Sequence, residues 1–151
     1  MDNPGPAVRR SNRVRVALAE DDDEQRDALQ RALELEGFEV VSFEDGSELV
    51  DYFGLTGTRI RWPDVVITDV GMPGRSGLDA IELARSRGAQ VPVFIVTGSA
   101  DPEIRARTTR MGNALLFLKP IHIDRLAQAI WQLVRVQQIG TDAEQDKLPP
   151  G

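Results

Sequence analysis

The sequence predicts an α/β protein with a doubly wound, five-stranded parallel sheet between two layers of helices. Two observations predict this class. Short apolar runs alternate with amphipathic stretches of helical length, which is the pattern of repeated strand and helix units. The apolar runs are nearly continuous, as expected of strands that are covered on both faces. Because crossovers between parallel strands are right-handed, the strand order 2-1-3-4-5 is the most economical topology.

The strands are predicted from runs of Val, Ile, Leu and Phe that end in polar residues. They cover residues 14–19, 38–43, 64–69, 92–97 and 115–118. Gly37 and Gly88 end two of the helical stretches, and Pro102 fits the first turn of another. The predicted helices cover 23–36, 46–53, 78–87, 102 to about 111, and a last stretch that begins near Asp124.

Length and composition indicate one folded domain. A chain of 151 residues with 41% hydrophobic residues can bury a single core. Residues 1–12 lack apolar periodicity and are predicted to be a flexible tail. Residues 139–151 are predicted to be a second tail or a linker, which leaves the domain at 13–138.

The charge and the rare residue types exclude several classes of function. A formal net charge of −6 argues against direct nucleic-acid binding, which needs clustered Lys and Arg. With no cysteine and one histidine, neither a disulfide framework nor a zinc site is expected. No apolar stretch approaches the roughly 20 residues of a membrane span, and no signal-peptide core is present. We therefore expect a cytoplasmic protein without a membrane contact.

Three carboxylates are predicted to meet at the carboxyl edge of the sheet. Glu20 and Asp21 follow the first strand, and Asp69 ends the third, which is its neighbour in the predicted order. Glu20 and Asp21 alone could equally be acidic residues that favour a helix N-terminus. The third carboxylate favours a cation, since three converging negative charges repel one another. Mg²⁺ fits such oxygen ligands, and the backbone carbonyl of Gly71 is a further candidate ligand.

Two other strand ends could assist a reaction at Asp69. An Asp carboxylate can attack phosphorus and form an acyl phosphate. Thr97 ends the fourth strand and Lys119 follows the fifth, so a hydroxyl and an ammonium could stabilise charge on phosphoryl oxygens. Alone, each would be an ordinary sheet or loop residue. Their joint placement favours phosphoryl chemistry, and Gly98 would leave room for the group.

Four segments together resemble the receiver domain of bacterial two-component response regulators, which has a flavodoxin-like fold. They are ALAEDDDEQR at 17–26, PDVVITDVGMPGRSGL at 63–78, VPVFIVTG at 91–98 and FLKP at 117–120. The resemblance implies that Asp69 accepts a phosphoryl group from a sensor histidine kinase or a phosphotransfer protein. Thr97 and Lys119 would then contact that group. The implied Mg²⁺ ligands are Glu20, Asp21, Asp69 and Gly71.

The resemblance also implies an output surface. In such domains the helix over 102–111, the strand over 115–118 and the last helix rearrange and signal to a downstream effector, and a homodimer is compatible with this role. One departure concerns the position three before Lys119, where an aromatic residue is usual. Here it is Leu116, and the aromatic residue is displaced to Phe117.

Two other classes of function compete with this interpretation. A Mg²⁺-dependent phosphatase of the haloacid-dehalogenase type also uses a strand-end Asp with Thr and Lys. It needs a second carboxylate two residues after the nucleophile, where this chain has Gly71. A purely structural binding module leaves the placement of Thr97 and Lys119 unexplained. The receiver interpretation predicts a phosphoacceptor switch that catalyses only its own phosphorylation and dephosphorylation, either alone or as the input module of a longer regulator.

Overall fold

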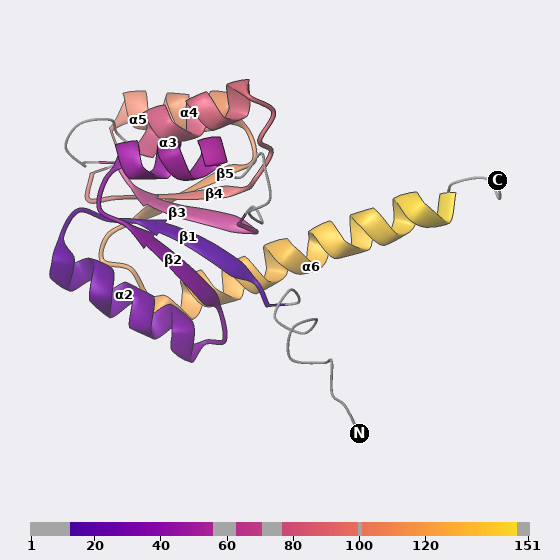
Figure 1. Cartoon of the computed structure of the whole chain (residues 1–151), viewed down its shortest axis with the longest axis horizontal. Coiled ribbons are helices and arrows are strands. Elements are labelled where there is room, and N and C mark those ends of the chain that lie inside the picture. The colour runs from indigo at the N-terminus through magenta and orange to yellow at the C-terminus, as the bar shows by residue number, and fades with distance from the viewer. Residues whose placement is uncertain (1–12, 56–62, 71–76, 100, 148–151) are drawn as a thin grey trace. The chain divides into compact units, whose positions relative to one another are not determined.

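The computed structural model describes residues 13–55, 63–70, 77–99 and 101–147, with only the backbone course at 54–55 and 136–147. Within these residues, strands and helices alternate along the chain (Figure 1). The strands are β1 (Arg15–Ala19), β2 (Glu39–Phe43), β3 (Val65–Asp69), β4 (Val93–Thr97) and β5 (Ala114–Leu118). Each agrees with its predicted range to within one residue at either end.

The strands form one parallel sheet in the order β2-β1-β3-β4-β5, which confirms the predicted topology. Its register decides which residues meet at the carboxyl edge. Ala19 pairs with Thr68, so the next residue of each strand, Glu20 and Asp69, also lie side by side. Asp69 pairs in turn with Val96, the residue before Thr97. The sheet therefore brings three predicted site residues to adjacent strand ends.

Helices connect the strands at positions close to those predicted. They are α2 (Asp23–Leu35), α3 (Gly46–Leu55), α4 (Gly77–Ser86), α5 (Pro102–Met111) and α6 (Ile123–Lys147). Two of them begin at an aspartate cap. The carboxylate of Asp22 accepts from the N–H of Gln25 at 2.9 Å, and that of Asp101 accepts from the N–H of Glu103 at 2.8 Å. After α2, Gly37 has φ 101°, a conformation that glycine adopts without strain.

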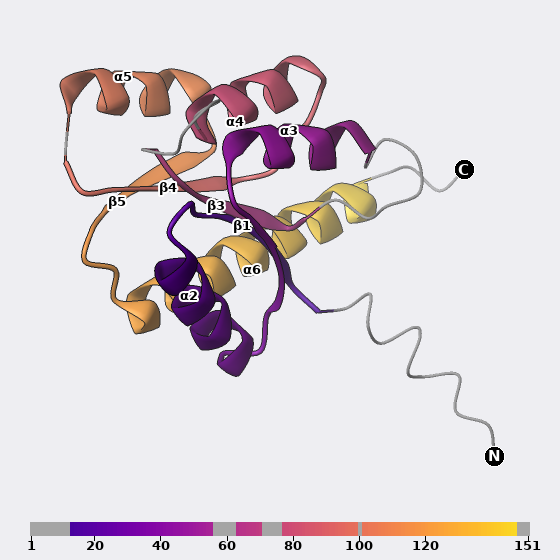
Figure 2. The same ribbon diagram turned by 60° about the vertical axis from the view of Figure 1, so that its left-hand side comes forward.

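The first unit of the chain, Met1–Ile121, has helices on both faces of the sheet. Figure 2 shows α2 on one face and α3, α4 and α5 on the other. Apolar side chains fill the space toward α3 and α4; they are Ala17, Ala19, Val66, Val93 and Ile95 from the sheet, with Leu49, Phe53, Leu78, Ile81 and Ala84 from the helices. The alternate positions point to the other face and are also buried; they are Val16, Leu18, Val65, Ile67 and Phe94. Burial on both faces explains the continuous apolar runs.

The second unit, His122–Gly151, contains α6. This helix begins close to the predicted Asp124 and continues to Lys147. It therefore extends past residue 138, where the predicted domain ends, and the first part of the predicted tail is helical. Among the described residues, no helix combines the length and the apolar composition needed to cross a membrane.

Candidate functional site

The structure brings Glu20, Asp21 and Asp69 together at the carboxyl edge of the sheet. One carboxylate oxygen of each lies within 4.8 Å of the others. The three side chains differ in their surroundings, because Glu20 is only 5% exposed whereas Asp21 is on the surface. The predicted fourth ligand, Gly71, lies outside the described residues. Three of the four predicted metal ligands are thus close enough to hold one ion.

Hydrogen bonds with β2 and with the start of α2 hold Glu20 in place. Its N–H donates to the carbonyl of Phe43 at 3.1 Å, which extends the pairing with β2 by one residue. Its carboxylate accepts from the N–H of Asp22 at 3.2 Å, and its carbonyl accepts from the guanidinium of Arg26 at 2.9 Å. These hydrogen bonds join the first turn of α2 to the end of β1 and hold the backbone at Glu20.

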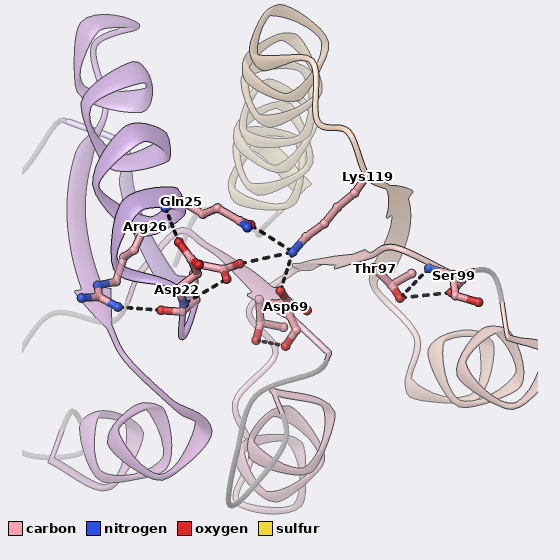
Figure 3. A network of polar contacts seen from close by, with 9 residues as sticks. Asp22, Gln25, Arg26, Asp69, Thr97, Ser99 and Lys119 are labelled. Atoms are coloured by element: carbon pink, nitrogen blue, oxygen red, sulfur yellow. Dashed lines mark hydrogen bonds and ion pairs between the residues drawn. The ribbon is translucent and has the colours of Figure 1, made fainter.

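Lys119 reaches the same cluster from the end of β5. Its N–H donates to the carbonyl of Thr97 at 2.8 Å, which extends the β4–β5 ladder and places the side chain next to Asp69. Its ammonium lies 2.6 Å from Asp69 Oδ2 and 3.6 Å from Glu20 Oε2 (Figure 3). It also donates to Gln25 Oε1 at 3.3 Å. The end of β5 thus brings the ammonium of Lys119 into contact with Asp69.

Gln25 is a site residue that the sequence did not predict. It lies in the first turn of α2, close behind Glu20 and Asp21 in the chain. The position of Gln25, in the helix that begins at the acidic cluster, is the one sequence signal that could have predicted its role. A glutamine in a polar stretch has no hydrophobic periodicity or motif that would distinguish it.

Burial and the neighbouring charged groups together shift the pKa values of Glu20 and Lys119. Burial, followed by the hydrogen bond with Asp69, raises the pKa of Glu20 to about 7, and the nearby Lys119 offsets only part of this. Burial lowers the pKa of Lys119, but the hydrogen bond and the charge of Asp69, together with Glu20, outweigh it and the pKa is raised. The ammonium therefore stays charged at neutral pH.

The donor set fits a divalent cation. Three ionised carboxylates and one ammonium carry a formal charge of −3 + 1, or −2, when Glu20, Asp21, Asp69 and Lys119 are all charged. Burial first, and then the neighbouring Asp69, raises the pKa of Glu20, so a negative charge on Glu20 is disfavoured at this site. A small cation with hard oxygen ligands, such as Mg²⁺, would stabilise that charge.

Thr97 lies at the site but is engaged elsewhere. Its hydroxyl donates to the carbonyl of Ser99 at 3.0 Å and accepts from the N–H of Ser99 at 3.2 Å. Figure 3 shows the hydroxyl directed toward Ser99. Gly98 lies between them, and a Cβ added there would meet nothing within 4 Å. The space beside Gly98 is therefore open among the described residues.

Leu116, which stands where an aromatic residue is usual, and the next residue, Phe117, point to opposite faces of β5. Leu116 packs against the core on the side of α3 and α4, together with Ile95, its pairing partner in β4. Phe117 lies next to Phe94, with 5.2 Å between the ring centroids, on the other face. Phe117 thus does not take over the position of an aromatic residue at 116.

Comparison with known proteins identifies the family of the chain. The family model described as the response regulator receiver domain matches residues 16–131. The chain is 33% identical over 114 residues to the C4-dicarboxylate transport transcriptional regulatory protein DctD of Rhizobium meliloti, which covers 76% of this chain and 24% of that protein. It is 30% identical over 122 residues to the cell cycle transcriptional regulator CtrA of Caulobacter vibrioides, covering 81% and 51%.

A solved structure shares the fold. The response regulator receiver domain protein from Clostridium thermocellum superposes with a TM-score of 0.73 at 25% identity, covering 83% of this chain and 98% of that one. The chain spans 24% to 51% of the two curated relatives named above. These comparisons give no support to the phosphatase alternative. Because the family model matches residues 16–131, which is most of the sequence, the chain belongs to the family of response regulator receiver domains.

Proposed function

We propose that Asp69 is the phosphoacceptor of this receiver domain. The observation that carries the proposal is the 2.6 Å contact between the ammonium of Lys119 and Asp69 Oδ2, next to two further carboxylates. In the proposed reaction, a carboxylate oxygen of Asp69 attacks phosphorus and forms an O–P bond. The P–N bond of a phosphohistidine, or the P–O bond of acetyl phosphate, breaks, and the leaving group keeps the electron pair.

The neighbouring side chains have distinct proposed roles. Lys119 would move its charge from Asp69 to a phosphoryl oxygen, and Thr97 would leave Ser99 to donate to another oxygen. Glu20, Asp21 and Asp69, with the carbonyl of Gly71, would hold Mg²⁺, whose charge offsets the repulsion between the incoming phosphoryl group and the carboxylates.

The proposed partners follow from the family and from the surface of the described residues. A sensor histidine kinase or a phosphotransfer protein would donate the phosphoryl group. The output would leave through α5, β5 and α6, to a downstream effector, to a further domain or to a second copy of the chain. Leu115 and Leu118 of β5, which are 51% and 50% exposed, are apolar contacts that such a partner could cover.

We further propose that the domain is a switch and does not turn over an external substrate. The position two residues after Asp69 is Gly71, so it lacks the carboxylate that a phosphatase of the haloacid-dehalogenase type needs as general acid. Steady release of phosphate from small phosphate esters would contradict this part of the proposal.

Labelling with acetyl phosphate tests the phosphoacceptor. The wild-type protein should gain one phosphoryl group in the presence of Mg²⁺ and none in excess EDTA, as measured by intact-protein mass spectrometry. Asp69→Asn should take no label, whereas Asp51→Asn, an exposed aspartate of α3, should be labelled like the wild type. Undiminished labelling of Asp69→Asn would exclude Asp69 as the acceptor.

A further inference from the structure

Lys119 has an acceptor that the proposed function does not use. An ammonium can donate three hydrogen bonds. Three oxygens lie around the ammonium of Lys119: Asp69 Oδ2 at 2.6 Å, Gln25 Oε1 at 3.3 Å and Glu20 Oε2 at 3.6 Å. Figure 3 shows Gln25 reaching Lys119 from α2, on the opposite side from Thr97. Asp69 and Glu20 are carboxylates with proposed roles, the first a hydrogen-bond acceptor and the second an ion-pair partner, and Gln25 accepts through a neutral amide.

The backbone of Gln25 is held by contacts that do not involve Asp69. The N–H of Gln25 donates to the capping carboxylate of Asp22 at 2.9 Å, so the residue belongs to a capped first turn. The next residue, Arg26, donates to the carbonyl of Glu20 at 2.9 Å and ties that turn to β1. The amide oxygen thus comes from a helix turn that contacts other than those of Asp69 hold in place.

The other two partners of Lys119 would change during phosphorylation. Formation of the acyl phosphate would remove the negative charge of the Asp69 carboxylate, and a metal ion held at the acidic cluster would draw on Glu20. An uncharged amide takes no part in either change. It also adds no fourth negative charge beside an incoming phosphoryl group.

We propose that Gln25 is a positioning residue that holds the ammonium of Lys119 beside Asp69 while the two carboxylates are engaged. The inference rests on the proposed function of Asp69 and Lys119. Gln25 acts through Lys119 and is not itself a phosphoryl ligand. Since the side chain is exposed, its substitution leaves the core unchanged.

Three variants separate this role from a general effect on the helix. Gln25→Leu removes the acceptor but keeps a good helix former of similar size. Gln25→Glu keeps an acceptor and adds a negative charge. Glu24→Gln is the matched control, because Glu24 is an exposed residue of the same turn. One readout is the rate of phosphoryl uptake from acetyl phosphate at saturating Mg²⁺. The other is the ¹H–¹⁵N signal of the Lys119 ammonium in the unphosphorylated protein, which is visible when hydrogen bonds slow its exchange with water.

Gln25→Leu should slow phosphoryl uptake about fivefold, as expected for the loss of one hydrogen bond to a charged group, and should broaden the Lys119 signal. Gln25→Glu should keep the signal yet also slow uptake, because its carboxylate competes with the phosphoryl oxygens for the ammonium. Glu24→Gln should leave both readouts close to wild type.

A wild-type rate together with a wild-type Lys119 signal in Gln25→Leu would overturn the proposal. Equal slowing by Gln25→Leu and Glu24→Gln would do the same, since it would reveal a general effect of the helix. If the wild-type protein takes up no phosphoryl group, the proposed function of Asp69 fails. The ammonium signal, which needs no phosphorylation, then still decides whether Gln25 holds Lys119.

Discussion

The hydroxyl of Thr97 is bonded to both backbone groups of Ser99, donating to the carbonyl at 3.0 Å and accepting from the N–H at 3.2 Å. The hydroxyl closes a local turn at the end of β4. It has a single hydrogen to donate, so it cannot donate to Ser99 and to a phosphoryl group at the same time. A contact between Thr97 and phosphorylated Asp69 therefore requires the bond to the Ser99 carbonyl to break.

This exchange predicts a signal at Ser99. Beryllofluoride, which forms a phosphoryl-like adduct with carboxylates, should shift the amide resonance of Ser99 in the wild type and in Thr97→Ser. Thr97→Val keeps the shape of the side chain without the hydroxyl. It should abolish the shift and weaken beryllofluoride binding about tenfold, because one donor to the charged group is lost. An amide resonance that stays in place when the wild type binds the adduct would refute the exchange.

Lys119 should oppose the binding of Mg²⁺. Its ammonium lies 2.6 Å from Asp69 Oδ2 and 3.6 Å from Glu20 Oε2, so it shares two of the three candidate metal ligands. Removing the charge in Lys119→Met should tighten Mg²⁺ binding about tenfold in calorimetric titration, since a nearby positive charge no longer repels the ion. Lys119→Arg keeps the charge and should bind Mg²⁺ like the wild type. Weaker binding by Lys119→Met would contradict the arrangement.

Much of the fold could be predicted because its strands are buried on both faces. Continuous apolar runs such as Val93–Thr97 have no other simple interpretation when they alternate with amphipathic helices. The end of α6 could not be predicted in this way. Residues 139–147 lack an apolar stripe and include Gly140, yet they contain no proline, and four of the nine residues (Ala143, Glu144, Gln145 and Lys147) favour a helix.

The residue types of the site could be predicted, but several of their contacts could not. Polar residues that end apolar runs mark the carboxyl edge, and topology alone places Glu20 beside Asp69. Which partner a side chain chooses depends on rotamers and on short distances that a sequence pattern does not encode. The bonds of Thr97 to Ser99 and of Lys119 to Gln25 are of this kind.

The raised pKa of Glu20 predicts a pH dependence of stability without metal. The pKa is 4.5 for an ordinary glutamate and about 7 in the folded protein, so the folded state binds the proton more tightly. This contribution to the free energy of unfolding is fully present below pH 4.5 and is lost as the pH rises through about 7. In EDTA, urea unfolding should show the wild type losing stability relative to Glu20→Gln across this range.

Binding of Mg²⁺ should depend on pH in the opposite sense. A metal ion needs the ionised carboxylate, so affinity should rise as the pH passes about 7, and Glu20→Gln should flatten this rise. For the prediction on stability, the contradicting result is a free energy of unfolding that varies with pH in the same way in the wild type and in Glu20→Gln. It would show that Glu20 has the same pKa in the folded and the unfolded state.

The start of α4 should tolerate no side chain at Gly77. A Cβ added there would lie 1.9 Å from the hydroxyl oxygen of Thr68 and 2.8 Å from the backbone oxygen of Asp69. Alanine favours a helix over glycine by about 1 kcal/mol, but the clash with a fixed strand outweighs this gain. We expect Gly77→Ala to lower the free energy of unfolding by about 2 kcal/mol, measured by urea denaturation. Gly98→Ala, where the added Cβ meets open space, should change the free energy of unfolding by less than about 0.5 kcal/mol.

Adding Thr68→Ala to Gly77→Ala should recover part of the lost stability. The recovery should be only partial, because the close contact with the Asp69 carbonyl would remain. Equal stability of Gly77→Ala and Gly98→Ala would show that α4 can shift away from β3.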